Sequence, residues 1–251
     1  MTSATVKGFT NEFAKMRQLG VVPVGSALLL GVLGLTMIAA LGDPSFAEPR
    51  TRSWLPMLGG MSMGVALMSP LMLAVLASRQ VDIEHQGQGW LLSATSGLTP
   101  GQVCRAKLVA LGAVVAMITI ATNVIILGVG LALGVPAPPP VGHWLAAVSG
   151  ALLVSLVLLA LHVVLAAKVE NQLVGLGIGV LGTLFAAFAS GLPTWLAHLA
   201  PWGYYALTRA AEYQGESVVL LLPSWPSLLG LAVVGGVVFA LVTGRLDRQE
   251  V

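Results

Sequence analysis

The chain has 251 residues, of which 57% are apolar and 9% are charged. A soluble domain has roughly 25% charged residues, so these proportions exclude a water-soluble fold and favour a protein embedded in lipid. The formal net charge of +2 and the lack of a basic run exclude nucleic acid as a partner.

The first segment, residues 6–19, has the pattern of an amphipathic helix. Phe9, Phe13 and Met16 recur at helical spacing, and the same segment carries Lys15 and Arg17. An apolar face combined with basic residues is typical of a helix that lies in the plane of a membrane surface. We therefore expect an interfacial helix on the inner leaflet, ahead of the first membrane span.

Six apolar stretches follow, each about as long as the 20 or so residues that a spanning helix needs. The predicted spans are residues 21–41, 55–77, 108–133, 145–167, 173–190 and 228–243. Strands are a poor interpretation of these stretches, because they lack period-2 alternation and an open sheet in lipid would leave backbone groups unpaired. The prolines in residues 136–140 are expected to end the third helix, and Asn171 to cap the fifth. We expect an all-α membrane protein with about six transmembrane helices in a single domain, residues 1–251.

Two longer segments lie outside the spans. Residues 79–107 predict a short helix from about Glu84 to Ala94, a turn at residues 97–101 and a basic start to the third span. Such a projection could receive a push from a soluble partner. Residues 191–227 mix Leu, Trp and Tyr with several prolines, which predicts short helices that re-enter the outer leaflet.

The distribution of Lys and Arg predicts the orientation. With both termini in the cytoplasm, nine of these residues fall in inner segments and three, Arg50, Arg52 and Arg209, in outer segments. This bias satisfies the positive-inside rule. We therefore expect a multi-pass protein of the cell membrane with both termini cytoplasmic.

The predicted spans contain no Asp, Glu, Lys or Arg. Transporters driven by an ion gradient usually keep such a group in the membrane to bind the driving ion, so its absence argues against that class. His162 could be a proton relay or a substrate contact, or could bond a neighbouring helix or face the interface. Asn123 could line a cavity or bond another helix. Glycines four residues apart, Gly60 with Gly64 and Gly175 with Gly179, permit either a dimer face or ordinary packing within the bundle.

Enzyme functions find little support. The four histidines are scattered, so no metal-binding spacing is present, and there is no Gly-x-Ser-x-Gly motif. A Walker-type phosphate-binding motif is also missing, so the chain is not expected to bind ATP. We expect no catalytic residues, no metal and no directly bound cofactor.

The segment from residue 84 to residue 107 resembles the inner loop of the ABC-2 type permeases. In that family an acidic residue precedes a Gly/Trp/Leu stretch, a proline-containing turn and a lysine, and the matching residues are Glu84, Gly89, Trp90, Leu91, Pro100 and Lys107. Residues 6–19 look like the connecting helix of the family, and the stretch with Pro193, Pro201 and Trp202 looks like its re-entrant outer segment. A polar loop with one interfacial tryptophan, ordinary in any multi-pass protein, is the plainer interpretation of the inner segment.

Within the family, the short chain and the pattern from Asn171 to Trp202 look most like the permeases for lantibiotic immunity and bacitracin resistance. The resemblance implies two permease subunits, of the same or different chains, paired with two ATPase subunits that bind ATP and magnesium. It implies export of an amphipathic peptide antibiotic, drug or lipid-like substrate by alternating access. A membrane scaffold or sensory subunit of a resistance complex, without transport of its own, is the alternative.

Overall fold

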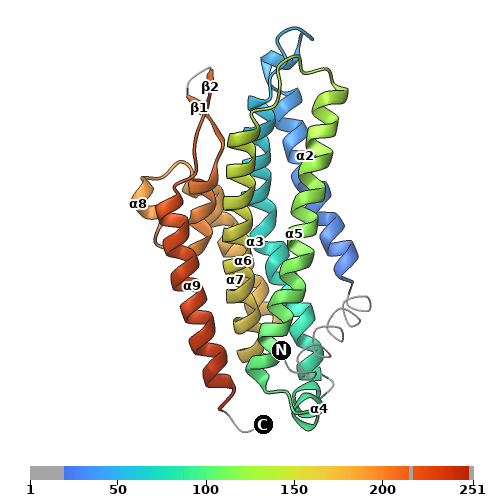
Figure 1. Cartoon of the computed structure of the whole chain (residues 1–251), viewed down its shortest axis with the longest axis vertical. Helices are drawn as coiled ribbons and strands as arrows, with labels where there is room; N and C mark the ends of the chain where they lie inside the picture. The colour runs from blue at the N-terminus through green and yellow to red at the C-terminus, as the bar shows by residue number, and fades with distance from the viewer. Residues whose placement is uncertain (1–19, 87, 215–216, 249–251) are drawn as a thin grey trace.

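The structure is a computed structural model that describes residues 20–86, 88–214 and 217–248. Six long helices in these ranges form an elongated bundle (Figure 1): α2 (Val21–Leu41), α3 (Leu55–Gln86), α5 (Pro100–Ala132), α6 (Val141–Lys168), α7 (Gln172–Ala189) and α9 (Trp225–Leu246). All six are long and apolar enough to cross a membrane. The predicted all-α membrane fold is therefore confirmed. The predicted interfacial helix at residues 6–19, with Phe9, Phe13, Lys15 and Arg17, lies outside the described residues.

Two helices extend further than the hydropathy of the sequence predicts. The second span was expected to end at residue 77, but α3 continues to Gln86, and α5 begins at Pro100 rather than at residue 108. A capping box starts α5: the Thr99 hydroxyl accepts from the Gln102 backbone N–H, while the Gln102 side chain accepts from the Thr99 N–H. Charged residues such as Glu84 and Lys107 consequently lie within long helices, and not in a loop.

The short helix α4 (Gly89–Thr95) connects α3 to α5 at one end of the bundle, which we call the α4 end (Figure 1). It starts five residues later than predicted, because Glu84 belongs to α3. Gly97, with a φ of 77°, ends it: the N–H of Leu98 bonds to the carbonyl of Ser93 across the turn. Glycine adopts this left-handed conformation without steric strain.

The opposite end, which we call the hairpin end, carries a strand pair that was not predicted. After α7 the chain forms α8 (Thr194–Ala197), which follows Pro193, and the 3₁₀ helix η2 (Pro201–Thr208). Strands β1 (Ala211–Gln214) and β2 (Ser217–Leu220) then pair antiparallel, with Ala211 opposite Leu220. A further 3₁₀ turn, η1 (Pro44–Phe46), follows α2. Segment 191–227 therefore contains short helices, as expected, together with a hairpin.

Helix α3 is central to the bundle and packs against α2, α6 and α7. Its Gly60 and Gly64 face α2, where a Cβ added at Gly60 would lie 2.7 Å from Cβ of Ala39. On α7, a Cβ added at Gly179 would lie 2.6 Å from Cβ of Ala74 on α3. Gly60, Gly64 and Gly179 therefore permit close packing within the bundle, the plainer of the two roles considered, whereas a Cβ added at Gly175 would meet nothing within 4 Å among the described residues.

Pro70 lies inside α3, roughly midway along it. Proline has no backbone N–H, so the carbonyl of Ala66, four residues earlier, receives no intrahelical hydrogen bond. The helix nevertheless continues through this position to Gln86.

Candidate coupling site and membrane cavity

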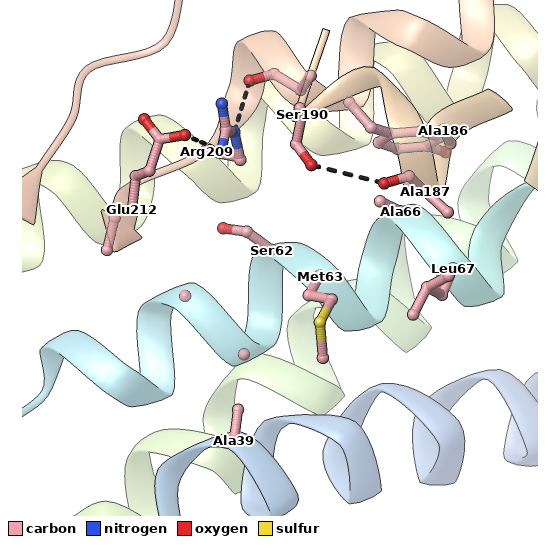
Figure 2. Close-up of a pocket in the computed structure, with 16 residues that line it drawn as sticks. Ala39, Ser62, Met63, Ala66, Leu67, Ala186, Ala187, Ser190, Arg209 and Glu212 are labelled. Atoms are coloured by element: carbon pink, nitrogen blue, oxygen red, sulfur yellow. Dashed lines mark hydrogen bonds and ion pairs between the residues drawn. The ribbon is translucent and has the colours of Figure 1, made fainter. Parts of the chain in front are cut away.

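A cavity of about 510 Å³ lies in the half of the bundle nearest the hairpin end, between α2, α3, α7 and the η2–β1 segment. Much of its wall consists of small side chains, including Ala39, Ala66, Ala186 and Ala187 (Figure 2). Because these side chains end at Cβ, they leave room that larger residues would fill. The volume falls within the range of about 300–1,000 Å³ that is typical of small-molecule sites.

Two charged side chains, Arg209 and Glu212, lie together at one end of the cavity (Figure 2). They form an ion pair in which Nη1 of Arg209 and Oε1 of Glu212 are 2.6 Å apart. The sequence prediction treated Arg209 only as an outer charge and gave Glu212 no role. No motif marks either residue, since only the tertiary fold brings them to the cavity.

At the α4 end, a buried ion pair joins α3 to α5. The Lys107 ammonium lies 2.8 Å from Oε1 of Glu84, and the two side chains are 0% and 1% exposed. Lys107 also donates a hydrogen bond of 2.8 Å to the carbonyl of Gln80. The pair therefore joins the end of α3 to the beginning of α5, which are the two helices on either side of α4.

Helix α4 packs directly on this ion pair. Gly89, its first residue, lies so close that an added Cβ would overlap the Glu84 carboxylate. Trp90 packs edge-on against His85 with ring centroids 5.7 Å apart, and its N–H points at Nδ1 of that histidine at 3.4 Å. The other ring nitrogen of His85, Nε2, therefore carries the proton and donates to the carbonyl of Ala166 at 2.9 Å. These contacts connect α4 through α3 to α6.

The residues of the predicted coupling segment thus occupy two different environments. Glu84 and Lys107 form the buried support beneath α4, and Gly89 and the half-buried Trp90 of α4 pack against it. Leu91 and Leu92 are 51% and 64% exposed and leave an apolar surface on α4. The face available to another protein is therefore apolar, and the acidic residue of the motif lies underneath it.

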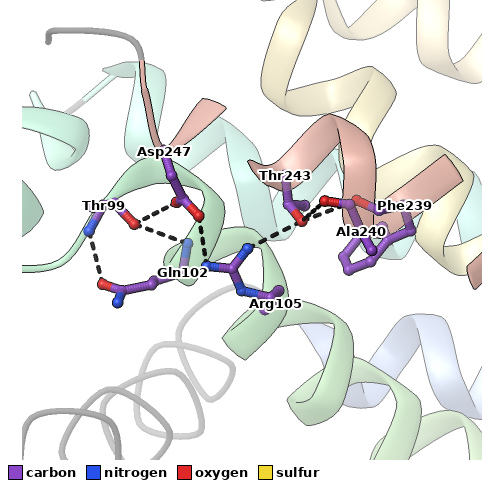
Figure 3. A network of polar contacts seen from close by, with 7 residues as sticks. All are labelled: Thr99, Gln102, Arg105, Phe239, Ala240, Thr243 and Asp247. Carbon is purple, nitrogen blue, oxygen red and sulfur yellow. Dashed lines mark hydrogen bonds and ion pairs between the residues drawn. The ribbon is translucent and has the colours of Figure 1, made fainter. Parts of the chain in front are cut away.

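A second polar network joins the start of α5 to the end of α9 (Figure 3). Arg105 donates to the hydroxyl of Thr243 at 3.1 Å and pairs with Asp247 at 2.8 Å, and the Thr99 hydroxyl donates to the same carboxylate. Partial burial acts to raise the pKa of Asp247. The hydrogen bonds from Thr99 and Arg105 and the positive charge of Arg105 outweigh that effect, so the pKa lies below its usual range.

Acidification is expected to remove the stabilisation that Asp247 provides. Because its pKa is lower in the folded chain, the stabilisation is present above the unfolded pKa of about 3.9 and is lost as the pH falls through the folded value. Arg105 is 42% exposed, so the effect should be about 0.2–1 kcal/mol. Thermal unfolding of the wild type and of Asp247→Asn should differ near pH 6 and converge at lower pH. A difference that stayed constant with pH would contradict this assignment.

The two polar residues predicted within spans have different surroundings. Oδ1 of Asn123 accepts a hydrogen bond of 2.8 Å from the indole N–H of Trp144, which joins α5 to α6. His162 is 2% exposed, and its ring lies edge-on to Trp202 with centroids 6.3 Å apart. Nε2 of His162 and Nε1 of Trp202 are both buried without a hydrogen-bond partner among the described residues.

A family model matches most of the chain. The family model described as ABC-2 family transporter protein matches residues 9–186. The chain belongs to the ABC-2 transporter family. ABC-2 permeases are membrane transport subunits that normally work with a separate ABC ATPase. No protein with a curated description matches the chain.

The ABC-2 match includes the whole junction of α3, α4 and α5, but it ends before the η2–β1 segment. The wall of the cavity formed by α2 and α3 therefore falls within the matched residues, whereas Arg209 and Glu212 lie beyond them. In the described ranges, no group of three His, Cys, Asp or Glu side chains is placed to hold a metal ion.

Proposed function

We propose that the chain is the permease subunit of an ATP-driven exporter and that an ATPase subunit acts on it through α4. The observation that carries this proposal is the construction of the α4 end. A short helix presents Leu91 and Leu92 to a partner while its base packs on the buried Glu84–Lys107 pair. A displacement of α4 would therefore reach α3 and α5 directly.

The charge distribution supports a cytoplasmic position for the α4 end. Among the described residues, six basic side chains lie towards the α4 end: Arg79, Arg105, Lys107, Lys168, Arg245 and Arg248. Three basic side chains, Arg50, Arg52 and Arg209, lie towards the hairpin end. This bias follows the positive-inside rule and supports the proposal that the α4 end, and with it both termini, faces the cytoplasm.

The state of the buried carboxylate supports ATP, and not an ion gradient, as the energy source. Glu84 is buried, but Lys107 neutralises it at 2.8 Å. An ion-coupled transporter needs an intramembrane group that can exchange its driving ion, and a carboxylate held by a buried ammonium is poorly suited to that task. ATP and magnesium would bind to the partner ATPase.

The proposed cargo is an amphipathic peptide antibiotic, a drug or a lipid-like molecule, as in the permeases for lantibiotic immunity and bacitracin resistance. A second permease subunit, either another copy or a different chain, would complete the transporter. The cavity, with small apolar side chains and a charged pair at one end, suits an amphipathic molecule.

Purification and reconstitution test the proposed function. A tagged chain, purified from the membrane in which it is naturally made, should copurify with a protein that carries a Walker phosphate-binding motif. Vesicles containing both should move a fluorescent amphiphile in an ATP-dependent manner. If the ATPase binds but no amphiphile moves, the chain is a scaffold or sensory subunit and the proposed transport is wrong.

Truncating the exposed leucines of α4 is expected to weaken binding of the ATPase and the stimulation of its ATP turnover by cargo. The double variant Leu91→Ala and Leu92→Ala removes apolar contact surface at an interface centre, where truncation of one anchor can cost more than 1 kcal/mol. ATPase affinity and cargo-stimulated ATP turnover should both fall at least about fivefold. Thr95→Ala, which trims an exposed polar side chain on the same helix, should leave both unchanged. Normal coupling in the double variant would rule out α4 as the contact.

A further inference from the structure

The cavity near the hairpin end has the polarity of an amphiphile. Figure 2 shows Arg209 and Glu212 at one end and Ala66, Leu67, Ala186 and Ala187 towards the other. Along α3 it extends from Gly59 to Leu67, a length of about 12 Å at 1.5 Å per residue. A hydrocarbon chain can therefore lie along the helices while its polar group meets the ion pair.

The Arg209–Glu212 pair has polar atoms that remain available to a ligand. Arg209 and Glu212 are 23% and 32% exposed, so both remain reachable from the cavity. The Arg209 side chain is fixed by Nε, which donates to the carbonyl of Ala206 at 3.0 Å, and by Nη1, which binds Oε1 of Glu212. Among the described residues, Nη2 of Arg209 and Oε2 of Glu212 have no hydrogen-bond partner. One donor group and one acceptor group are thus left for a ligand.

The presence of both signs of charge selects the headgroup. An anionic group would be attracted by Arg209 but repelled by Glu212. A purely cationic group would be attracted by Glu212 but repelled by Arg209. A zwitterion with a phosphate and an ammonium satisfies both charges at once, because the guanidinium hydrogen-bonds phosphate oxygens well and the carboxylate attracts the ammonium. Desolvation of either charge is then compensated, as partly buried charges require.

We infer that this cavity binds a single hydrocarbon chain attached to a zwitterionic phosphate–ammonium headgroup, with the phosphate on Arg209 and the ammonium on Glu212. The residues that would recognise the headgroup, Arg209 and Glu212, lie beyond the residues that match the family, whereas the α2 and α3 walls of the cavity lie within them. The assignment of this amphiphile as the exported cargo rests on the proposed function, but its binding to the cavity does not.

Binding to the purified full-length chain in maltoside micelles tests the site. Three nitroxide-labelled probes with the same alkyl chain are compared: an alkylphosphocholine, an alkylphosphate and an alkyltrimethylammonium. The phosphocholine should bind most tightly. Arg209→Gln should weaken phosphocholine binding at least about tenfold, because a hydrogen bond to a charged group is lost. Glu212→Gln should weaken phosphocholine binding but strengthen alkylphosphate binding, a change of opposite sign that misfolding cannot produce.

Two matched substitutions of alanine by phenylalanine test where the probe binds. Ala66→Phe puts a ring into the cavity and should abolish phosphocholine binding. Ala121→Phe, at an exposed position of α5 away from the cavity, should leave it unchanged. Equal affinity for all three probes, or phosphocholine binding that survives Ala66→Phe, would overturn the proposal.

Transport separates this proposal from the proposed function. If the phosphocholine probe binds selectively but is not moved by ATP in vesicles, the binding site is supported and the proposed export function is wrong. If other amphiphiles are moved by ATP but the phosphocholine probe does not bind selectively, the export function is supported and the proposed binding site is wrong.

Discussion

Replacing Glu84 with alanine is expected to lower the free energy of unfolding by about 3–5 kcal/mol. The substitution leaves the Lys107 ammonium, which is 0% exposed, without the carboxylate 2.8 Å away. A buried charge that loses its partner keeps its desolvation cost and loses its compensation. Unfolding of the purified chain in detergent, followed by its tryptophan fluorescence, measures the loss.

A double variant separates the stability of this pair from its role in coupling. Glu84→Leu combined with Lys107→Met removes both charges and should recover most of the lost stability, since apolar replacement of a buried pair is often neutral. If the pair also transmits movement from α4, cargo-stimulated ATP turnover should stay low in the restored protein. An alanine variant as stable as the wild type would show that the pair is not buried in solution.

Replacing Gly101 with alanine is expected to destabilise the protein by about 1–3 kcal/mol. Gly101 lies in the first turn of α5, where an added Cβ would overlap the backbone carbonyl oxygen of Thr243 and the carboxylate of Asp247. A backbone atom cannot rotate away, so α5 and α9 would have to separate. The contacts of Arg105 with Thr243 and Asp247 would be strained as well.

Gly128 provides the matched control on the same helix. A Cβ at this position meets nothing within 4 Å, so Gly128→Ala should be neutral or slightly stabilising, by up to about 1 kcal/mol. Both variants change one glycine of α5 to alanine and differ only in what the new methyl group meets. Equal unfolding temperatures for the two variants would argue against close contact between α5 and α9.

The spans could be predicted from the sequence because lipid requires long apolar helices, and composition alone reveals them. The ends of α3 and α5 could not be predicted by the same rule. Hydropathy treats Glu84 and Lys107 as isolated charges, whereas in the fold they neutralise each other across two helices. A local signal at one of these ends was readable: Thr99, Pro100 and Gln102 form the capping pattern that starts α5.

The contacts of two tryptophans could not be predicted from the sequence either. Trp54 and Trp144 lie near predicted helix ends, yet they are 2% and 3% exposed and pack edge-on with ring centroids 5.8 Å apart. Their indole N–H groups bond to the carbonyl of Ala137 and to Asn123 inside the protein. Such partners lie on other segments. The cavity is equally invisible in the sequence, because it results from small side chains on three helices that only the fold brings together.

Pro70 leaves α3 with one missing backbone hydrogen bond near its middle. The Glu84–Lys107 pair lies on its α4 side, and the cavity residues from Gly59 to Leu67 lie on the other. Because α3 lacks one backbone hydrogen bond at Pro70, bending there would cost less than elsewhere in the helix. This position falls between the α4 end, where the ATPase would act, and the cavity. Bending at Pro70 would let a displacement of the α4 end change the width of the cavity, without moving the whole of α3 along its axis through the lipid.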